Sequence, residues 1–234
     1  MAEKILTFNG KTISGPNGGG GMVVLKTPPF YGDGVTIGGR TYPTVIIGNQ
    51  EWLAENLDFA WDGLPVPTST ARTKNTPQAM YYNYDESTYG WDGYKCGLLY
   101  NWYAVKYLED NKSTLIPGWH VPTKSEYESL KTAIESGGST NTAGTKLKAK
   151  DNTAASNWPS GWNGTDDYGF NVLPAGRYDD FWETIGIYAQ IWAASEMDDK
   201  YAHLVFFNKN WTTMDFADNY KIQQSSVRLV RDAT

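Results

Sequence analysis

The sequence contains a single cysteine, Cys96, and only two histidines, His120 and His203. One cysteine excludes an intrachain disulfide, and one cysteine with two separated histidines does not supply the clustered ligands that zinc requires. Neither histidine lies in a motif that pairs it with a serine or cysteine nucleophile. We expect Cys96 to be a small core residue and His120 to have a structural, hydrogen-bonded role. No catalytic and no metal-binding residue is predicted.

Long apolar runs and clusters of positive charge are also missing. The chain has no apolar run of about 18 residues, so we expect no insertion into a membrane. Its formal net charge is −6 and it has no stripe of Lys and Arg, so a nucleic acid is not expected as a partner. Residues 1–15 lack the positively charged and then apolar layout of a secretory signal, and no signal peptide is evident.

Carboxylates occur as neighbouring pairs at 166–167, 179–180 and 198–199. Such pairs could bind calcium, but their spacing fits no EF-hand loop, and the calcium-dependent sugar motifs Glu-Pro-Asn and Gln-Pro-Asp are absent. We therefore predict no cofactor and keep calcium as an alternative. The pairs could also be the acid and base of a carbohydrate-active enzyme, but nothing in the sequence fixes their separation. Solvated loop charge is the preferred interpretation.

Aromatic residues are abundant: they form 15% of the chain and include 10 Trp and 16 Tyr. With 40% hydrophobic and 20% charged residues, the 234-residue chain can form one large globular domain with a small appendage. Residues 1–34 are the predicted appendage, because a hairpin around Asn9-Gly10 precedes a flexible joint at glycines 18–21. An extra strand folded back onto the domain is the alternative. Residues 35–234 form the predicted domain.

The patterns within 35–234 indicate short strands, two central helices and long connections, hence an α+β fold. Thr123 and Glu126 form a capping box that starts a helix, and Gly137-Gly138 ends it. Residues 98–108 are apolar on nearly every side, which suits a buried helix or strand, and 144–149 suit a short helical turn. Residues 65–79 are predicted as loop. The predicted strands are 35–37, 40–42, 45–47, 51–53, 172–173, 201–207 and 226–231.

Five phrases occur in fixed order: TVIIGNQEWLAENLD (44–58), GLLYNWYAV (97–105), PGWHVPTKSEYESL (117–130), GFNVLPAGR (169–177) and SSVRLVRD (225–232). Together they resemble the Fibrobacter succinogenes major paralogous domain family. The resemblance implies a C-type-lectin-like fold with two main helices, short antiparallel strands and long irregular loops, in which the first and last strands pair. It also implies ligand recognition on a loop-rich face without catalysis. The chain departs from many relatives at Leu229, where they carry Cys.

The segment 187–220 is the candidate binding surface, because it mixes aromatic, Asn and Asp residues without a sustained period and is interrupted by turn-prone residues. Rigid aromatic side chains among small polar ones are typical of antibody-like binding surfaces. Trp192 and Leu204 are expected in the core. The candidate ligand-binding residues are Tyr188, Gln190, Asp198, Lys200, Tyr201, His203, Asn208, Asn210, Trp211, Asp215, Phe216, Asn219 and Tyr220.

Some lectin-like proteins close to this family are targets of diversity-generating retroelements, which mutate adenines in a C-terminal stretch. Most of the candidate residues are types that such a process yields from Asn codons, so the resemblance implies a possible variable protein of a phage or prophage. The expected partner is a protein or glycan on a bacterial surface, with attachment to a virion or cell envelope through the N-terminal segment. The expected location is a phage tail or cell surface. A structural protein of a virion or envelope, or an enzyme, is the alternative.

Overall fold

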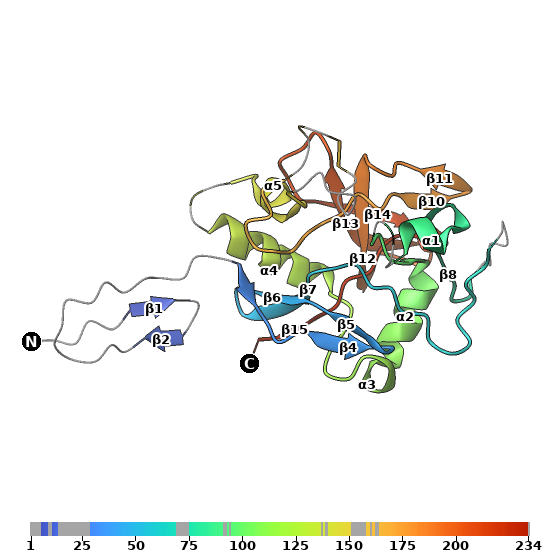
Figure 1. Cartoon of the computed structure of the whole chain (residues 1–234), viewed down its shortest axis with the longest axis horizontal. Coiled ribbons are helices and arrows are strands. Elements are labelled where there is room, and N and C mark those ends of the chain that lie inside the picture. Colours follow the sequence, from blue (N-terminus) through green and yellow to red (C-terminus); the bar gives the residue numbers. More distant parts are fainter. Residues whose placement is uncertain are drawn as a thin grey trace, which may run out of the picture.

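The computed structural model describes residues 6–8, 11–13, 29–68, 75–90, 93, 95–136, 138, 140–150, 158–159, 161 and 164–233. Short antiparallel strands and helices share the body of the molecule, which is an α+β fold (Figure 1). The helices are η1 (Tyr82–Tyr84), α1 (Glu86–Tyr89), α2 (Trp102–Asp110), α3 (Lys112–Leu115), α4 (Lys124–Glu135) and α5 (Ala143–Leu147). The strands are β1 (Leu6–Phe8), β2 (Lys11–Ile13), β3 (Phe30–Tyr31), β4 (Val35–Ile37), β5 (Arg40–Tyr42), β6 (Thr44–Ile47), β7 (Gln50–Leu53), β8 (Ala79–Met80), β9 (Leu99–Tyr100), β10 (Arg177–Asp179), β11 (Phe181–Glu183), β12 (Tyr188–Glu196), β13 (Tyr201–Asn208), β14 (Asp215–Tyr220) and β15 (Val230–Asp232).

Several local patterns in the sequence gave the right elements. β1 pairs with β2 and β4 with β5, and both hairpins were predicted from their two-residue turns. Residues 98–108 contain both candidate structures, since β9 leads directly into α2. The loop predicted at 65–79 ends one residue early, at the start of β8. Residues 30–31 already pair with β6, so the body of the structure includes residues before 35. The glycines at 18–21 lie outside the described residues.

A four-stranded sheet in the order β15-β7-β6-β3 brings the last strand beside strands from the start of the domain. Val230 pairs with Trp52 of β7. Two expectations need correction here. The last strand pairs with β7, the second strand of the β6–β7 hairpin, rather than with the first strand. It also begins at Val230 rather than at 226, because the preceding residues bridge three separate segments instead of following one neighbour, in the pairs Tyr178–Gln224, Tyr100–Ser225 and Ile191–Ser226.

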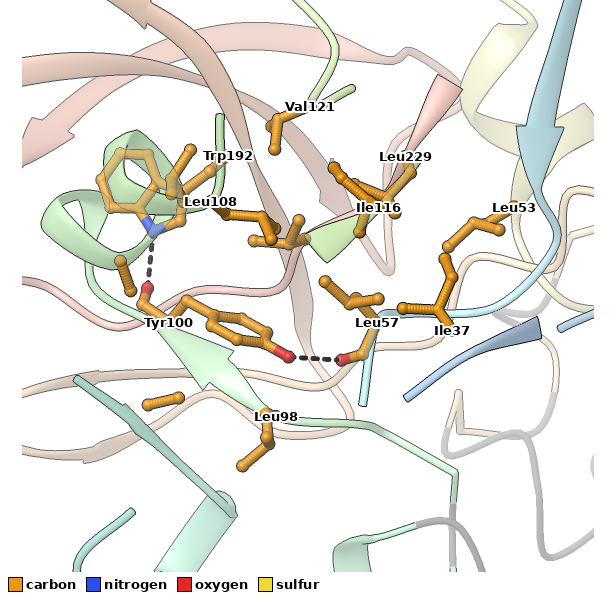
Figure 2. Packing of buried hydrophobic residues seen from close by; sticks show 14 of the residues in the cluster. Ile37, Leu53, Leu57, Leu98, Tyr100, Leu108, Ile116, Val121, Trp192 and Leu229 are labelled. Atoms are coloured by element: carbon orange, nitrogen blue, oxygen red, sulfur yellow. Dashed lines mark hydrogen bonds between the residues drawn. The ribbon is translucent and has the colours of Figure 1, made fainter. Parts of the chain in front are cut away.

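A three-stranded sheet in the order β12-β13-β14 lies between two hydrophobic clusters. One cluster joins Trp192 and Leu204 to Trp102, Val105 and Leu108 of α2. Figure 2 shows this cluster, in which the Trp192 indole N–H donates to the Tyr100 carbonyl at 2.8 Å. The prediction that Trp192 and Leu204 belong to the core is therefore confirmed.

The second cluster joins the other face of the same sheet, through Val205 and Phe207, to Tyr127, Leu130 and Ile134 of α4. These three α4 residues lie at helical spacing on the buried face, as the sequence predicted. Each face of the sheet thus packs in part against a different helix, α2 on one side and α4 on the other.

The start of α4 is fixed by side chains that also hold the last strand. Thr123 Oγ1 accepts from the Glu126 N–H, and a Glu126 carboxylate oxygen accepts from the Thr123 N–H at 2.7 Å, which completes the predicted capping box. The other Glu126 oxygen lies 2.6 Å from His120 Nε2, and this contact raises the pKa of His120. The His120 backbone in turn bridges Val230. The structural role expected for His120 is confirmed.

Candidate ligand-binding face

The β12–β14 sheet leaves part of each face uncovered. Side chains alternate across a strand, so Tyr201, His203, Val205 and Phe207 of β13 lie on one face, and Leu204, Phe206 and Asn208 lie on the other. α4 covers the first face at Val205 and Phe207 but not at Tyr201 and His203. α2 covers the second face at Leu204, and Phe206 is only partly buried. The uncovered areas therefore lie on opposite faces and at opposite ends of β13.

Tyr201, His203, Asp218 and Tyr220 form the first uncovered group, here named the Tyr201 cluster. The register of β13 and β14 sets Tyr201 opposite Tyr220 and His203 opposite Asp218. The two tyrosine rings are 4.6 Å apart between centroids, at an angle of 35°. A hydrogen bond that the Tyr201 hydroxyl donates to the Tyr220 hydroxyl raises the pKa of Tyr201, and His203 Nδ1 contacts the Asp218 carboxylate. Tyr220 is 48% exposed, so this cluster presents aromatic surface beside an imidazole–carboxylate pair.

The turn that leads into the Tyr201 cluster is held by Asp198. Its Oδ1 accepts from the backbone N–H groups of Lys200 and Tyr201, at 2.7 and 2.8 Å. These two bonds lower the pKa of the Asp198 carboxyl. Asp198 and Lys200 are both exposed at the edge of the cluster, and the turn conformation explains the presence of an aspartate at 198 without a ligand.

Tyr188, Phe206 and Trp211 form the second uncovered group, here named the Trp211 cluster. Phe206 lies between the other two rings, with centroids 4.9 Å from Tyr188 and 5.6 Å from Trp211. Trp211 is 47% exposed. Asn208 is 9% exposed, and its side-chain oxygen accepts from the Asn210 N–H at 2.8 Å, which shapes the turn that carries Trp211.

Lys148 also stabilises the turn that carries Trp211. Its ammonium donates to the backbone carbonyls of Asn208, Lys209 and Trp211 at 3.2, 3.1 and 3.0 Å. It also lies 5.3 Å from the centre of the Trp158 ring. Burial lowers the pKa of Lys148. The turn between β13 and β14 is therefore held in one arrangement by a buried cation that immediately follows α5.

The remaining predicted residues lie apart from both clusters or take structural roles. Gln190 is only 4% exposed, and its Oε1 accepts from Gln223 Nε2 at 2.7 Å inside the protein, so it cannot reach a ligand in this structure. Asp215 lies opposite Phe206 of the Trp211 cluster, and its carboxylate accepts from the Thr213 hydroxyl at 2.6 Å. Phe216 packs partly buried against the α4 cluster. Asn219 pairs with Ala202, on the face opposite Tyr220.

The comparison with protein families gives one match, which covers residues 45–231 and is described as the Fibrobacter succinogenes major domain. This chain belongs to that family. The comparison with curated proteins and the comparison with solved structures found no match. The matched residues contain the β12–β14 sheet and the two main helices, α2 and α4, and they include the Tyr201 cluster and the Trp211 cluster.

In this member of the Fibrobacter succinogenes major domain family, the carboxylate pairs lie in separate turns. Asp166 accepts from the Asn171 N–H at 2.8 Å, and burial raises its pKa to about 6. Asp179 and Asp180 lie at the β10–β11 turn, and Asp198 has the turn role described above. Across the described residues, no group of three or more His, Cys, Asp or Glu side chains could hold a metal ion. No described helix is long and apolar enough to cross a membrane.

Two members of the uncovered groups were not among the predicted site residues. Asp218 joins the site because it lies opposite His203, and Phe206 because it lies between Tyr188 and Trp211. A usable signal was present: if the hairpin is centred between Asn210 and Trp211, residues whose numbers sum to 421 lie opposite each other, and His203 then pairs with Asp218. The register between the two strands, however, is set by their pairing in the folded sheet, and the sequence pattern alone does not define it.

Proposed function

We propose that this protein is a non-catalytic recognition protein whose ligand contacts the Tyr201 cluster. One observation carries the proposal: two neighbouring strands hold Tyr201 and Tyr220 side by side at the surface, with His203 and Asp218 beside them on the same face. The ligand class is a protein or glycan on a bacterial surface. The two tyrosines offer aromatic surface to such a ligand, and the hydroxyl, imidazole and carboxylate groups offer hydrogen-bonding atoms.

The energetic argument rests on rigidity. Tyrosine has few rotatable bonds, so a tyrosine already held by a neighbouring ring loses little conformational freedom when a ligand covers it. The rings are held from behind by strands whose central residues, Leu204 and Val205, are buried in the two core clusters. Alanine substitution of a central aromatic contact typically weakens binding by about 2 kcal/mol or more. Two such contacts are sufficient for a specific site.

The C-type-lectin-like classification and the retroelement origin are part of the same proposal. Membership of the family over 45–231 supports them, as does the position of the candidate residues just before β15, which pairs with β7. Sequencing the same locus from several isolates tests the origin. Differences concentrated at Tyr201, His203, Asp218 and Tyr220 would support it, whereas an even spread along the gene would contradict it. We place the protein on a virion or cell surface.

The decisive experiment measures retention of fluorescently labelled protein on intact cells of a panel of bacterial strains. In a strain that binds the parent protein, Tyr201→Ala/Tyr220→Ala is expected to weaken retention at least about tenfold, or 1.4 kcal/mol. Its Tm should fall by no more than about 4 °C, because a cross-strand pair contributes about 0.2–1 kcal/mol. Tyr31→Ala is the matched control, because Tyr31 is a highly exposed tyrosine on β3, outside the cluster.

Three results would contradict the proposal. Retention could be unchanged in the double variant and lost in Trp211→Ala, which would place the ligand on the Trp211 cluster. The double variant could unfold, which would assign both tyrosines to the fold. Light scattering of the free chain could show a stable oligomer that dissociates on Tyr220→Ala, which would make the cluster a subunit contact.

A further inference from the structure

A groove outside the β12–β14 sheet has the features of a separate small-molecule site. It has a volume of about 310 Å³, and its lining residues are Trp61, Asp62, Gly63, Pro65, Thr76, Pro77 and Tyr107 of α2. Small-molecule sites generally occupy about 300–1,000 Å³, so this one suits a single ring or a pair of rings rather than a long chain. None of the residues of the Tyr201 cluster or the Trp211 cluster lines it.

The centre of the groove is a stacked aromatic pair. The Trp61 and Tyr107 rings are nearly parallel, at 12°, with centroids 5.3 Å apart. Phe59 supports Trp61 from another side at 6.3 Å. Trp61 is only 7% exposed, whereas Tyr107 is 43% exposed. The pair therefore forms a flat aromatic platform. The Tyr107 ring is its accessible surface, and the buried Trp61 ring fixes the position of Tyr107.

Three polar groups at this platform have no partner within the part of the chain that the structure describes. Among the described residues, the Trp61 indole N–H, the Asp62 carboxylate and the Tyr107 hydroxyl form no hydrogen bond or ion pair, although Trp61 is almost fully covered. The Trp61 N–H is also not sealed in the interior, since it is absent from the buried polar atoms that lack partners. By contrast, the Tyr103 hydroxyl on the same helix donates to Asn75 at 2.9 Å. The groove thus offers one donor, one carboxylate acceptor and one hydroxyl that can do both.

We propose that this groove binds a neutral hexopyranose, such as a terminal sugar of a glycan. The C–H bonds on one face of a pyranose carry slight positive charge and suit the negative face of an aromatic ring, here that of Tyr107. The vicinal hydroxyls of the sugar donate to the Asp62 carboxylate, and the Trp61 N–H donates to a sugar oxygen. The Asp62 carboxylate and the net charge of −6 disfavour an anionic sugar. This site is independent of the proposed ligand surface on the sheet.

Saturation-transfer NMR on the full chain tests the proposal, with methyl glycosides of glucose, galactose, mannose and N-acetylglucosamine as probes. At least one is expected to bind with a Kd of about 1–10 mM. Tyr107→Ala should weaken binding at least about tenfold by removing the platform. Asp62→Asn and Trp61→Phe should each weaken it several-fold, because each keeps the shape and loses one hydrogen-bonding group. Tyr103→Phe is the control on the same helix and should bind as the parent does.

Several outcomes would overturn the inference. They are the absence of binding to every neutral glycoside at about 50 mM, binding that Tyr107→Ala leaves intact, and equal binding of a glucuronide and the matching glucoside. Binding of a proline-rich peptide in place of any glycoside would also overturn it, since that would make the aromatic groove a peptide site. Tyr201→Ala/Tyr220→Ala should leave glycoside binding unchanged. Loss of glycoside binding in that variant would place the sugar on the sheet and reject the groove.

Discussion

On β13, Tyr201 and Phe206 are both aromatic, yet they lie on opposite faces of the sheet and belong to different uncovered clusters. Gln190 and Asn208 are polar and were expected at the surface, but both are buried and hydrogen-bonded. In each case the residue type alone was compatible with exposure or burial. The strand partner and the helix on that face decided between them.

Asp166 gives the clearest pH dependence among single residues. Its folded-state pKa of about 6 lies above its ordinary value of 3.8, because burial disfavours the charged carboxylate. Its contribution to stability is therefore fully present below about pH 4 and is lost as the pH rises through about 6. Asp166→Asn keeps the acceptor for the Asn171 N–H. The variant should be more stable than the parent above pH 6, by about 1–2 kcal/mol, and should lose the slope between pH 4 and 6.

Urea unfolding at a series of pH values measures this effect. Asp167→Asn is the control, because Asp167 is the exposed neighbour. It should reduce the slope only in part, because burial is the largest cause of the raised Asp166 pKa and the Asp167 charge is a smaller one. If Asp166→Asn were less stable than the parent at pH 7, the carboxylate would be a favourable charge at this site and the prediction would fail.

The turn between β13 and β14 shows how one element depends on another that precedes it by sixty residues in the chain. Thr145 N–H donates to the Thr212 carbonyl at 3.0 Å, and Lys148 donates to three carbonyls of the same turn. The close approach also explains Gly144, where a Cβ atom would lie 2.1 Å from the Thr213 carbonyl oxygen. α5 therefore sets the position from which Trp211 is presented.

Lys148→Met tests this dependence. Three carbonyls would lose their donor, so we expect a loss of about 1–3 kcal/mol in stability and faster hydrogen exchange at the amides of 209–213. Lys146→Met is the control on α5, because Lys146 donates to the Ile134 carbonyl instead of the turn. Equal exchange at 209–213 in the two variants, measured by mass spectrometry, would show that the ammonium does not hold the turn.

Over the whole molecule, Arg228 joins segments that lie far apart in the sequence. Its guanidinium donates to Asn56 Oδ1 and to the carbonyls of Leu53, Phe170 and Asn171, at 2.8–3.0 Å. It is fully buried over the Phe170 ring, and burial lowers its pKa to about 10. The β6–β7 hairpin, the 170–171 segment and the approach to β15 thus meet on one side chain.

Arg228→Met should reduce the free energy of unfolding by about 3–5 kcal/mol, because it removes the donor from three buried acceptors and one partly buried acceptor. Unfolding in guanidinium chloride, monitored by circular dichroism, measures this free energy. Lys106→Met is the comparison, since Lys106 pairs with exposed Asp110 on α2, and its loss should be below about 1 kcal/mol. A similar loss in the two variants would mean that the Arg228 bonds are replaced by water in the variant.

The sequence by itself determined the local elements and the family. Thr123 and Glu126 specify the start of α4, and glycine turns specify the early hairpins. The five ordered phrases indicate the family, and the family match over 45–231 confirms it. These features depend on residues close together in the chain, where capping and turn geometry are sufficient.

Only the tertiary structure decided which side chains of 187–220 face outward and together. The 224–226 segment bridges three distant neighbours instead of continuing a strand, and the helices α2 and α4 each cover only part of one face of the β12–β14 sheet. The expected single surface therefore became two, on opposite faces. The physical reason is that exposure depends on strand register and on the layer packed against each face, and both are set by contacts between residues far apart in the chain.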